Sequence, residues 1–322
     1  MLSEFDLIAR YFTRPKNINS HTALGVGDDC ALLASPPGVQ MAISTDMLVE
    51  GRHFFGGANA AKLGHKCLAV NLSDLAAMGA EPLAFTLALS LPEINEDWLQ
   101  GFSQGLFALA DEHGCDLIGG DTTKGPLTIC ITVFGQVPAS QALRRDAAQP
   151  ADDVWVSGNL GDARLALAGR NAEMVLDTAT VEAAAVRMDQ PTPRLALGKK
   201  LRGLAHAALD VSDGLAGDLN HILKASGVGA TLEVDALPFG PTLIALPLDI
   251  KRHFALAGGD DYELCFTAPA SGREQVLAAA QAAGTAVTRI GRIEAEPGLR
   301  LLDKQGKPVK INLQSFDHFR TP

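Results

Sequence analysis

The chain has 322 residues, of which 47% are hydrophobic and 20% charged, and its formal net charge is −10. This length usually means two domains with a sizeable core. The acidic balance argues against a nucleic-acid partner, which would favour a basic face, and the absence of an apolar run of about 18 residues argues against a membrane span.

The cysteines and the first residues of the chain indicate a cytoplasmic protein. The sequence beginning MLSEFDLIARYF lacks the basic flank and apolar centre of a signal peptide. None of the five cysteines lies in a C-x-x-C pair, so we expect reduced thiols rather than a zinc or iron–sulfur site.

The first part of the chain reads as alternating strands and helices. The apolar spacing of residues 3–12 predicts a helix, with Ser3 as a possible cap. The predicted strands are 28–34, 39–45, 82–92, 115–121 and 127–137, and the predicted helices are 59–80 and 95–114.

A stretch rich in Ala, Pro and charge at about 138–150 predicts a domain boundary, after which a similar rhythm resumes. The predicted strands of the second part are 153–158, 206–214, 230–235, 262–269 and 286–293. The first predicted helix of this part begins at residue 161, and a longer helical stretch after it ends near residue 203. Two further helices are predicted at 215–227 and 271–284. We therefore predict an α+β protein with interleaved α/β elements in each of two domains, 1–138 and 150–322.

Carboxylates recur where an apolar run ends beside Gly, Ser or Thr. Asp28 and Asp29 in GVGDDCALL are the first example, and two adjacent carboxylates at the start of a strand need compensation. The full set is Asp28, Asp29, Asp46, Asp74, Asp121, Asp210, Asp213, Asp260, Asp261 and Glu263. Strand ends are where proteins of this class build sites.

Such a set suits Mg²⁺, which takes hard oxygen ligands and bridges to phosphate oxygens. Ser44 and Thr45 before Asp46 add neutral oxygens. The alternative is that each aspartate only caps a helix or shapes a turn, and we assign Asp116 and Asp218 to that role. Six turns chosen independently would use Asn, Ser and Gly as freely, so the whole set favours a metal site.

For three further positions, a ligand contact and a purely structural or solvent-exposed role both fit the sequence. His53 follows Arg52 after a predicted strand and is either a substrate contact or a loop residue. Arg144 and Arg145 either hold a phosphate or remain a solvated pair. Phe316 near the C-terminus either stacks on a heterocycle or packs on the core.

Familiar nucleotide motifs are missing. The chain has no G-x-x-x-x-G-K-[ST] loop and no H-R-D followed by D-F-G, and GDARLALAG is not a dinucleotide fingerprint.

Six motifs together resemble the thiamine-monophosphate kinase family of the aminoimidazole ribonucleotide synthetase-like superfamily. They are GVGDDCALL, STDMLVEGRHF, NLSDLAAMGA, IGGDTTKG, LDVSDGL and GGDDYEL, in this order along nearly the whole chain. The resemblance implies an N-terminal α/β domain that dimerises through its sheet and a C-terminal α/β domain. It also implies phosphorylation of thiamine monophosphate to thiamine diphosphate with ATP and several Mg²⁺ ions.

The resemblance also implies which residues bind each ligand. The implied metal ligands are Asp28, Asp29, Ser44, Thr45, Asp46, Asp74, Asp121, Asp210 and Asp213. The implied ATP contacts are Ser103, Gly120, Asp121, Arg145 and Ser212. The implied substrate contacts are His53, Asp261 and Phe316, where the family often has tryptophan.

The implied chemistry needs no general base, because the acceptor oxygen of a phosphate monoester is already anionic at neutral pH. Bringing two anions together needs metal ions that bridge them. We therefore expect direct in-line transfer of the ATP γ-phosphate. The rivals are another enzyme of the superfamily and a non-catalytic nucleotide sensor; the N-terminal loop has no reactive cysteine of the selenophosphate synthetase kind, and the chain ends in HFRTP rather than in cysteine.

Overall fold

The computed structural model describes residues 4–14, 21–26 and 30–311, and its internal contacts divide the chain into two compact units. The N-terminal unit comprises residues 1–75 and 80–140, and the C-terminal unit comprises residues 76–79 and 141–322.

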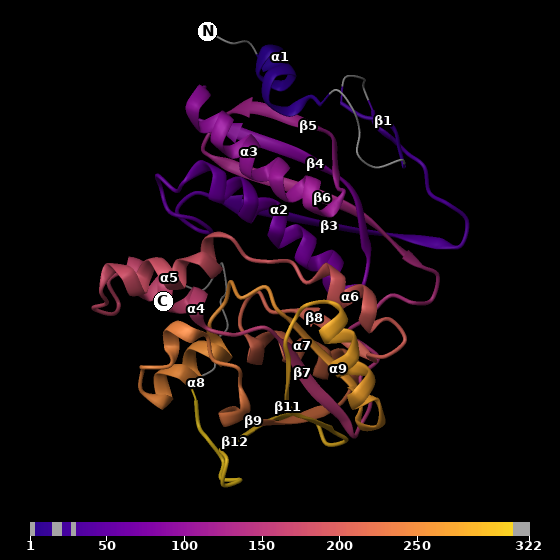
Figure 1. Cartoon of the computed structure of the whole chain (residues 1–322), viewed down its shortest axis with the longest axis vertical. Coiled ribbons are helices and arrows are strands. Elements are labelled where there is room, and N and C mark those ends of the chain that lie inside the picture. Colours follow the sequence, from indigo (N-terminus) through magenta and orange to yellow (C-terminus); the bar gives the residue numbers. More distant parts are fainter. Residues whose placement is uncertain (1–3, 15–20, 27–29, 312–322) are drawn as a thin grey trace. The chain divides into compact units, whose positions relative to one another are not determined.

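The N-terminal unit contains a four-stranded sheet in the order β3-β6-β4-β5 (Figure 1). Strands β4 and β5 are parallel, and β6 is antiparallel to both β3 and β4. The elements of this part of the chain are α1 (Glu4–Leu7), the π-helical turn η1 (Ile8–Phe12), β1 (Thr22–Leu24), β2 (Leu32–Leu33), β3 (Val39–Val49), α2 (Ala60–Ala77), β4 (Glu81–Leu91), α3 (Glu96–His113), β5 (Asp116–Lys124) and β6 (Thr128–Pro138).

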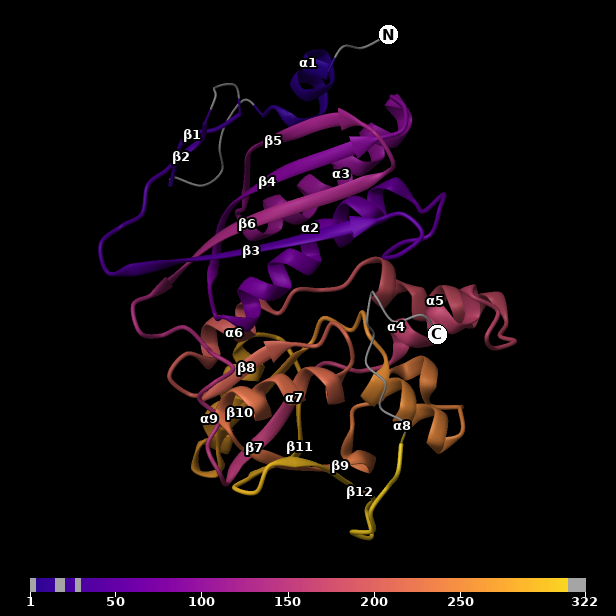
Figure 2. The ribbon, with the colours of Figure 1, turned by 180° about the vertical axis from the view of Figure 1, so that it is seen from behind.

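Helices α2 and α3 cover one face of this sheet, as Figure 2 shows from behind. Alternation explains the arrangement, because Ile129, Ile131 and Val133 of β6 are buried while the residues between them are half-buried. Helix α3 begins where the Asn95 side chain accepts a 3.0 Å hydrogen bond from the N–H of Trp98. The same alternation leaves apolar side chains of β3 on the opposite, exposed face.

The C-terminal unit contains a six-stranded sheet in the order β12-β9-β11-β7-β10-β8, in which only the β12–β9 pair is parallel. Its elements are β7 (Asp152–Ser157), α4 (Asp162–Arg170), α5 (Thr178–Asp189), α6 (Leu195–Leu201), β8 (Ala207–Asp210), α7 (Leu215–Ser226), β9 (Gly229–Glu233), η2 (Val234–Ala236), η3 (Pro241–Leu243), α8 (Leu248–Ala257), β10 (Leu264–Pro269), η4 (Ala270–Gly272), α9 (Arg273–Ala282), β11 (Val287–Glu294) and β12 (Gly298–Leu302).

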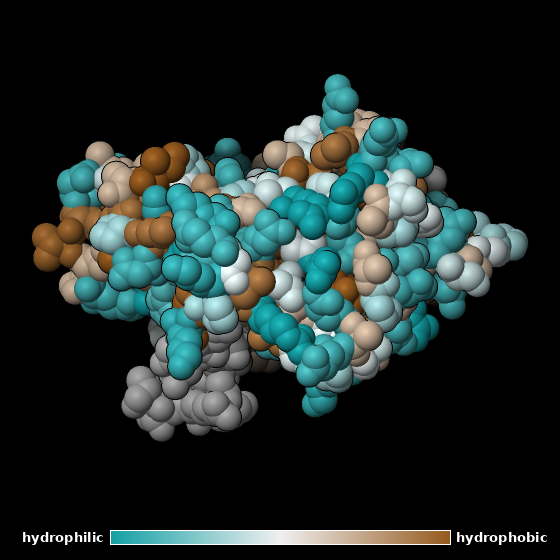
Figure 3. All heavy atoms as spheres, turned by 90° about the horizontal axis from the view of Figure 1, so that it is seen from below, coloured by the Kyte–Doolittle hydropathy of each residue, from teal (hydrophilic) through white to brown (hydrophobic). Residues whose placement is uncertain are grey.

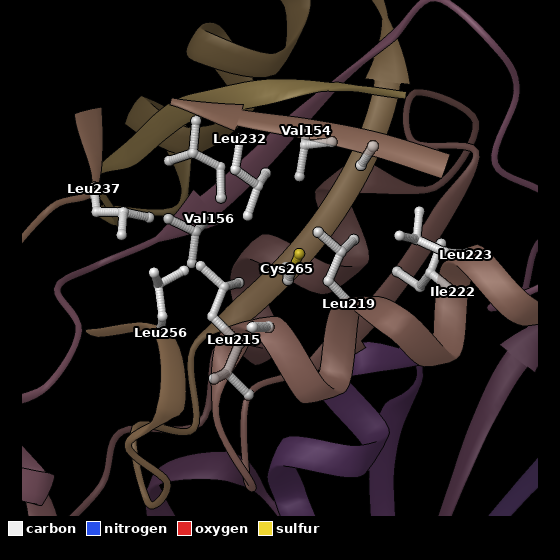
Figure 4. Close-up of a cluster of buried hydrophobic side chains, with 14 of the residues drawn as sticks. Val154, Val156, Leu215, Leu219, Ile222, Leu223, Leu232, Leu237, Leu256 and Cys265 are labelled. Atoms are coloured by element: carbon white, nitrogen blue, oxygen red, sulfur yellow. The ribbon is translucent and has the colours of Figure 1, made fainter. Parts of the chain in front are cut away.

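The core of the C-terminal unit lies between α7 and this sheet. Figure 4 shows Leu215 and Leu219 of α7 among side chains from the strands, including Val156 of β7 and Cys265 of β10. All four are at most 1% exposed. Helix α7 ends at Ser226, and Gly227 directly after it takes the left-handed conformation.

The predicted α+β class is confirmed, and most predicted elements are present. The long helical stretch predicted to end near 203 is two helices, α5 and α6, because Pro191 and Pro193 interrupt it. Helix α8 and strand β12 were not predicted, and the predicted strand 28–34 is reduced to Leu32–Leu33 within the described residues.

In the part of the chain that the structure describes, no helix is both long and apolar enough to cross a membrane. The face shown in Figure 3 is mostly hydrophilic, with hydrophobic residues in separate groups, as is usual for a protein surface.

Candidate functional site

In the N-terminal unit, β3 and α2 bring Ser44 and Asp74 into contact, and Asp46 lies two residues from Ser44 on the same face of β3. The Ser44 hydroxyl donates a hydrogen bond to Oδ2 of Asp74, and the backbone N–H of Asp46 donates to Oδ1 of Asn71 at 3.0 Å. Asn71 is fully buried and its Nδ2 donates to the carbonyl oxygen of Cys67 at 2.9 Å. Helix α2 is therefore tied to the middle of β3.

The chemistry of this group fits Mg²⁺. Ser44 and Asp46 are two residues apart on β3, so their side chains share the face that α2 covers. Two carboxylates and one hydroxyl are hard oxygen donors, which Mg²⁺ prefers. Among the described residues, no three His, Cys, Asp or Glu side chains gather into a metal-binding cluster, and Asp28 and Asp29 lie outside the described residues.

Thr45 lies on the other face of the sheet. Its Oγ1 is 2.8 Å from Oγ1 of Thr132 on β6, its partner in the β3–β6 register. The structure therefore does not bring the Thr45 side chain together with Ser44 and Asp46. The alternation of a strand already implies this separation, and the sequence reading did not use that signal.

Gly120 and Asp121 lie on the edge strand β5. Asp46, Ile131, Leu87 and Gly120 form one register row across the four strands. Gly120 has φ of 150°, and a Cβ atom there would lie 1.8 Å from the carbonyl oxygen of Leu87, so only glycine fits. Asp121 is exposed next to it.

His53 and Ser103, the other predicted contacts of this unit, each form a hydrogen bond with a nearby backbone group. The ring Nδ1 of His53 accepts a 3.0 Å hydrogen bond from the N–H of Val49, so the neutral ring carries its proton on Nε2. Ser103 is only 8% exposed, and its hydroxyl donates to the carbonyl oxygen of Gln100 within α3 at 3.2 Å.

In the C-terminal unit, the LDVSDGL and GGDDYEL motifs lie side by side. The N–H of Tyr262 donates to the carbonyl oxygen of Val211 at 2.8 Å, and the N–H of Asp260 donates to that of Ser212 at 2.9 Å. The N–H of Val211 donates to the carbonyl oxygen of Glu263 at 2.7 Å. These bonds continue the β8–β10 pairing beyond the ends of both strands.

The predicted residues of the first motif occupy the end of β8 and the loop after it. Asp210 closes β8 and is 6% exposed, whereas Ser212 and Asp213 are half-buried. Arg145 has an exposed side chain, and its carbonyl oxygen accepts a 2.8 Å hydrogen bond from the Ser226 hydroxyl. Phe316 lies outside the described residues.

Asp261 is buried inside the C-terminal unit, with 1% of its surface exposed. Its Oδ1 accepts a 2.9 Å hydrogen bond from the N–H of Gly161, and its Oδ2 has no hydrogen-bond partner among the described residues. Burial raises the pKa of this carboxyl well above its usual range, with a further contribution from Glu263. Its role as a substrate contact stays a prediction.

Glu263, which the sequence groups with the carboxylates of the predicted metal site, is the centre of a buried ion-pair cluster. Its carboxylate accepts hydrogen bonds from Arg187 Nη2 at 2.8 Å, Arg194 Nε at 2.6 Å and Ser157 Oγ at 2.6 Å. The Glu263 side chain is fully buried and both arginines are mostly buried. No local pattern links these residues, because they come from α5, the start of α6, β7 and the start of β10.

The chain matches two family models. The AIR synthase related protein N-terminal domain matches residues 27–137, and the AIR synthase related protein C-terminal domain matches residues 149–304.

Relatives in other organisms align over the full length of the chain. Thiamine-monophosphate kinase of Salmonella typhimurium is 46% identical, with 99% of each chain covered. The crystal structure of thiamine-monophosphate kinase from Stenotrophomonas maltophilia is 48% identical, with a TM-score of 0.84 over 90% of this chain and 93% of that one. The structure of AaThiL complexed with AMPPCP and TMP is 29% identical, with a TM-score of 0.77 over 89% of each chain. The chain therefore belongs to the thiamine-monophosphate kinase family of AIR synthase related proteins.

Proposed function

We propose that this protein uses ATP and Mg²⁺ to phosphorylate thiamine monophosphate to thiamine diphosphate. The observation that carries the proposal is the full-length similarity to thiamine-monophosphate kinases, one of which is complexed with AMPPCP and TMP. The oxygen-rich group of Ser44, Asp46 and Asp74 provides the kind of donors that such a reaction requires.

The proposed metal ligands are the nine residues implied by the resemblance: Asp28, Asp29, Ser44, Thr45, Asp46, Asp74, Asp121, Asp210 and Asp213. Of these, Thr45 has its side chain on the face of the sheet opposite to Ser44 and Asp46. When bound, Mg²⁺ ions supply positive charge that screens the repulsion between donor and acceptor phosphates. In the N-terminal unit, one hydrogen bond holds the Ser44 hydroxyl against the Asp74 carboxylate, and another ties the Asp46 backbone to Asn71 of α2, so this part of β3 is positioned before any ligand arrives.

The proposed ATP contacts are Ser103, Gly120, Asp121, Arg145 and Ser212, and the proposed substrate contacts are His53, Asp261 and Phe316. Glycine is required at position 120 because a Cβ atom there would collide with the carbonyl oxygen of Leu87, its partner on β4, so the close pairing of β5 with β4 beside Asp121 depends on this glycine. The acceptor phosphate is already a nucleophile, so no side chain has to remove a proton. Transfer is in line, without a phosphoenzyme, and retention of configuration at a chiral γ-phosphate would contradict this.

We also propose that the protein is a cytoplasmic homodimer formed through the exposed face of the β3-β6-β4-β5 sheet. Met41, Ile43 and Met47 of β3 are 36%, 61% and 55% exposed. Three large apolar side chains spaced by two or four residues on one strand share a face, and such a patch is typical of a protein–protein interface.

The test of the function is an ADP-release assay with ATP and Mg²⁺ that compares thiamine monophosphate with free thiamine. Turnover with the monophosphate alone, yielding the diphosphate, is the expected result. Turnover with neither acceptor, alongside tight binding of ATP and Mg²⁺, would contradict the kinase proposal and favour a nucleotide sensor.

A further inference from the structure

One carboxylate of α7 holds the loop between β8 and α7 through two hydrogen bonds to its backbone. Oδ2 of Asp218 accepts two hydrogen bonds, from the backbone N–H of Ser212 at 3.0 Å and from that of Asp213 at 3.1 Å. Asp218 is 5% exposed. A single buried oxygen therefore fixes the direction of two successive peptide groups.

The same loop is held from its other side by the GGDDYEL segment. The carbonyl oxygens of Val211 and Ser212 accept hydrogen bonds from Tyr262 and Asp260. A Cβ atom on Gly259 would lie 2.5 Å from the carbonyl oxygen of Ser212, so the two segments are in close contact. Within this contact, the N–H groups of Ser212 and Asp213 have Asp218 as their partner, and the carbonyl groups have the opposite segment.

We infer that Asp218 is a positioning residue for the reaction: it orients Ser212 and Asp213 toward nucleotide and metal without contacting either. This inference rests on the proposed function, because Ser212 and Asp213 are proposed ATP and metal contacts. Removal of the Asp218 acceptor breaks both of these hydrogen bonds, and the loop then rearranges to make others in their place. Outer groups that orient metal ligands typically change metal affinity or activity by about 10- to 100-fold when mutated.

A purely structural role for Asp218 is the competing explanation. A carboxylate in the first turn of α7 also stabilises the positive end of this helix. That role predicts a lower melting temperature for a variant but an unchanged requirement for Mg²⁺. Both explanations therefore predict a less stable variant, but only the positioning role predicts a changed dependence of binding and activity on Mg²⁺ and nucleotide.

The experiment compares Asp218→Ala, Asp218→Asn and the control Leu219→Ala in the full-length protein. Leu219 is the next residue of α7, fully buried in the core, and its truncation lowers stability without touching the loop. Each variant is measured for its melting temperature, for binding of a non-hydrolysable ATP analogue by calorimetry at varied Mg²⁺ concentration, and for the Mg²⁺ concentration that gives half-maximal activity.

We expect Asp218→Ala to raise the half-saturating Mg²⁺ concentration by about 10- to 100-fold. Asp218→Asn should keep the half-saturating Mg²⁺ concentration close to the wild-type value, because the amide oxygen still accepts hydrogen bonds. Leu219→Ala should change only the melting temperature. Wild-type Mg²⁺ dependence in Asp218→Ala would overturn the inference. So would an Asn variant as impaired as the Ala variant, because the charge rather than the acceptor would then matter.

Calorimetry separates this inference from the proposed function. If the wild-type protein binds the ATP analogue with Mg²⁺ but does not phosphorylate thiamine monophosphate, the kinase proposal fails. The role of Asp218 is then still tested by calorimetry, because the three variants should keep the same order in their Mg²⁺-dependent binding of the ATP analogue.

Discussion

The backbone N–H of Asp46 donates a hydrogen bond to Oδ1 of Asn71 at 3.0 Å, and this bond joins the middle of β3 to α2. Asn71 is fully buried, so a change to alanine removes two hydrogen bonds in the interior and costs about 1–3 kcal/mol of stability. We expect Asn71→Ala also to lower kcat/KM, because Asp46 loses its fixed position. Leu72→Ala, also fully buried on α2, is the control that loses stability alone, and an equal loss of activity in both variants would contradict this role.

Asp46 and Asp74, the two described carboxylates grouped with Ser44, should be essential for activity and dispensable for folding. Asp46→Asn and Asp74→Asn each remove a charge while keeping the size of the side chain. We expect kcat to fall by orders of magnitude, as it should for Asp29→Ala, with melting temperatures close to that of the wild type. Steady-state kinetics over a range of Mg²⁺ concentrations and thermal unfolding check this. A variant that loses its fold instead would indicate a turn-forming role.

The Glu263 cluster should be important for stability. Glu263→Gln leaves Arg187 and Arg194 without their buried partner, and breaking a buried ion pair in this way costs about 3–5 kcal/mol. Denaturant unfolding measures the difference. Glu296→Gln, which removes an exposed partner of Arg300, is the matched control and should unfold like the wild type. Equal stability of the two variants would show that the cluster contributes nothing.

The buried Asp261 should make stability depend on pH. Its folded pKa is raised by burial, by Glu263 and by Asp162, and lowered by the Gly161 N–H and by Arg187. A carboxyl with a raised folded pKa favours the folded state while protonated, and this contribution is lost as the pH rises through the folded pKa.

We therefore expect Asp261→Asn, which stays neutral, to gain stability relative to the wild type as the pH rises from 5 to 8. Melting temperatures of both proteins across this range measure the effect. A difference between the two that is constant with pH would contradict a raised pKa.

The exposed face of β3 should carry the proposed dimer contact. Ile43 is 61% exposed, and Ile43→Asp places a charge in the proposed interface. We expect this variant to be a monomer in light scattering, whereas the wild type is a dimer. Val175→Asp, at a fully exposed position of the C-terminal unit, is the control and should leave the dimer intact. A wild-type monomer at micromolar concentration would contradict the proposal.

Local patterns in the sequence determined the class of fold and the positions of the carboxylates. Apolar alternation predicted the central strands, because a sheet with one covered face requires period two. The recurrence of Asp beside Gly, Ser and Thr marked a strand end at Asp210 of β8, whereas Asp46 and Asp121 lie within β3 and β5 and Asp74 lies within α2. The same alternation already separates Thr45 from Ser44 and Asp46, so this part of the geometry was available from the sequence.

Only the tertiary structure decided which of these groups meet. The approach of Ser44 to Asp74 depends on how α2 packs on β3, and the pairing of Asp260 with Ser212 depends on strand order in the C-terminal sheet. The sequence predicts only a cap or turn role for Asp218, and the packing of α7 decides which two loop amides its carboxylate accepts from. Contacts between residues far apart in the chain depend on packing and burial of whole elements, and no short stretch of sequence encodes them.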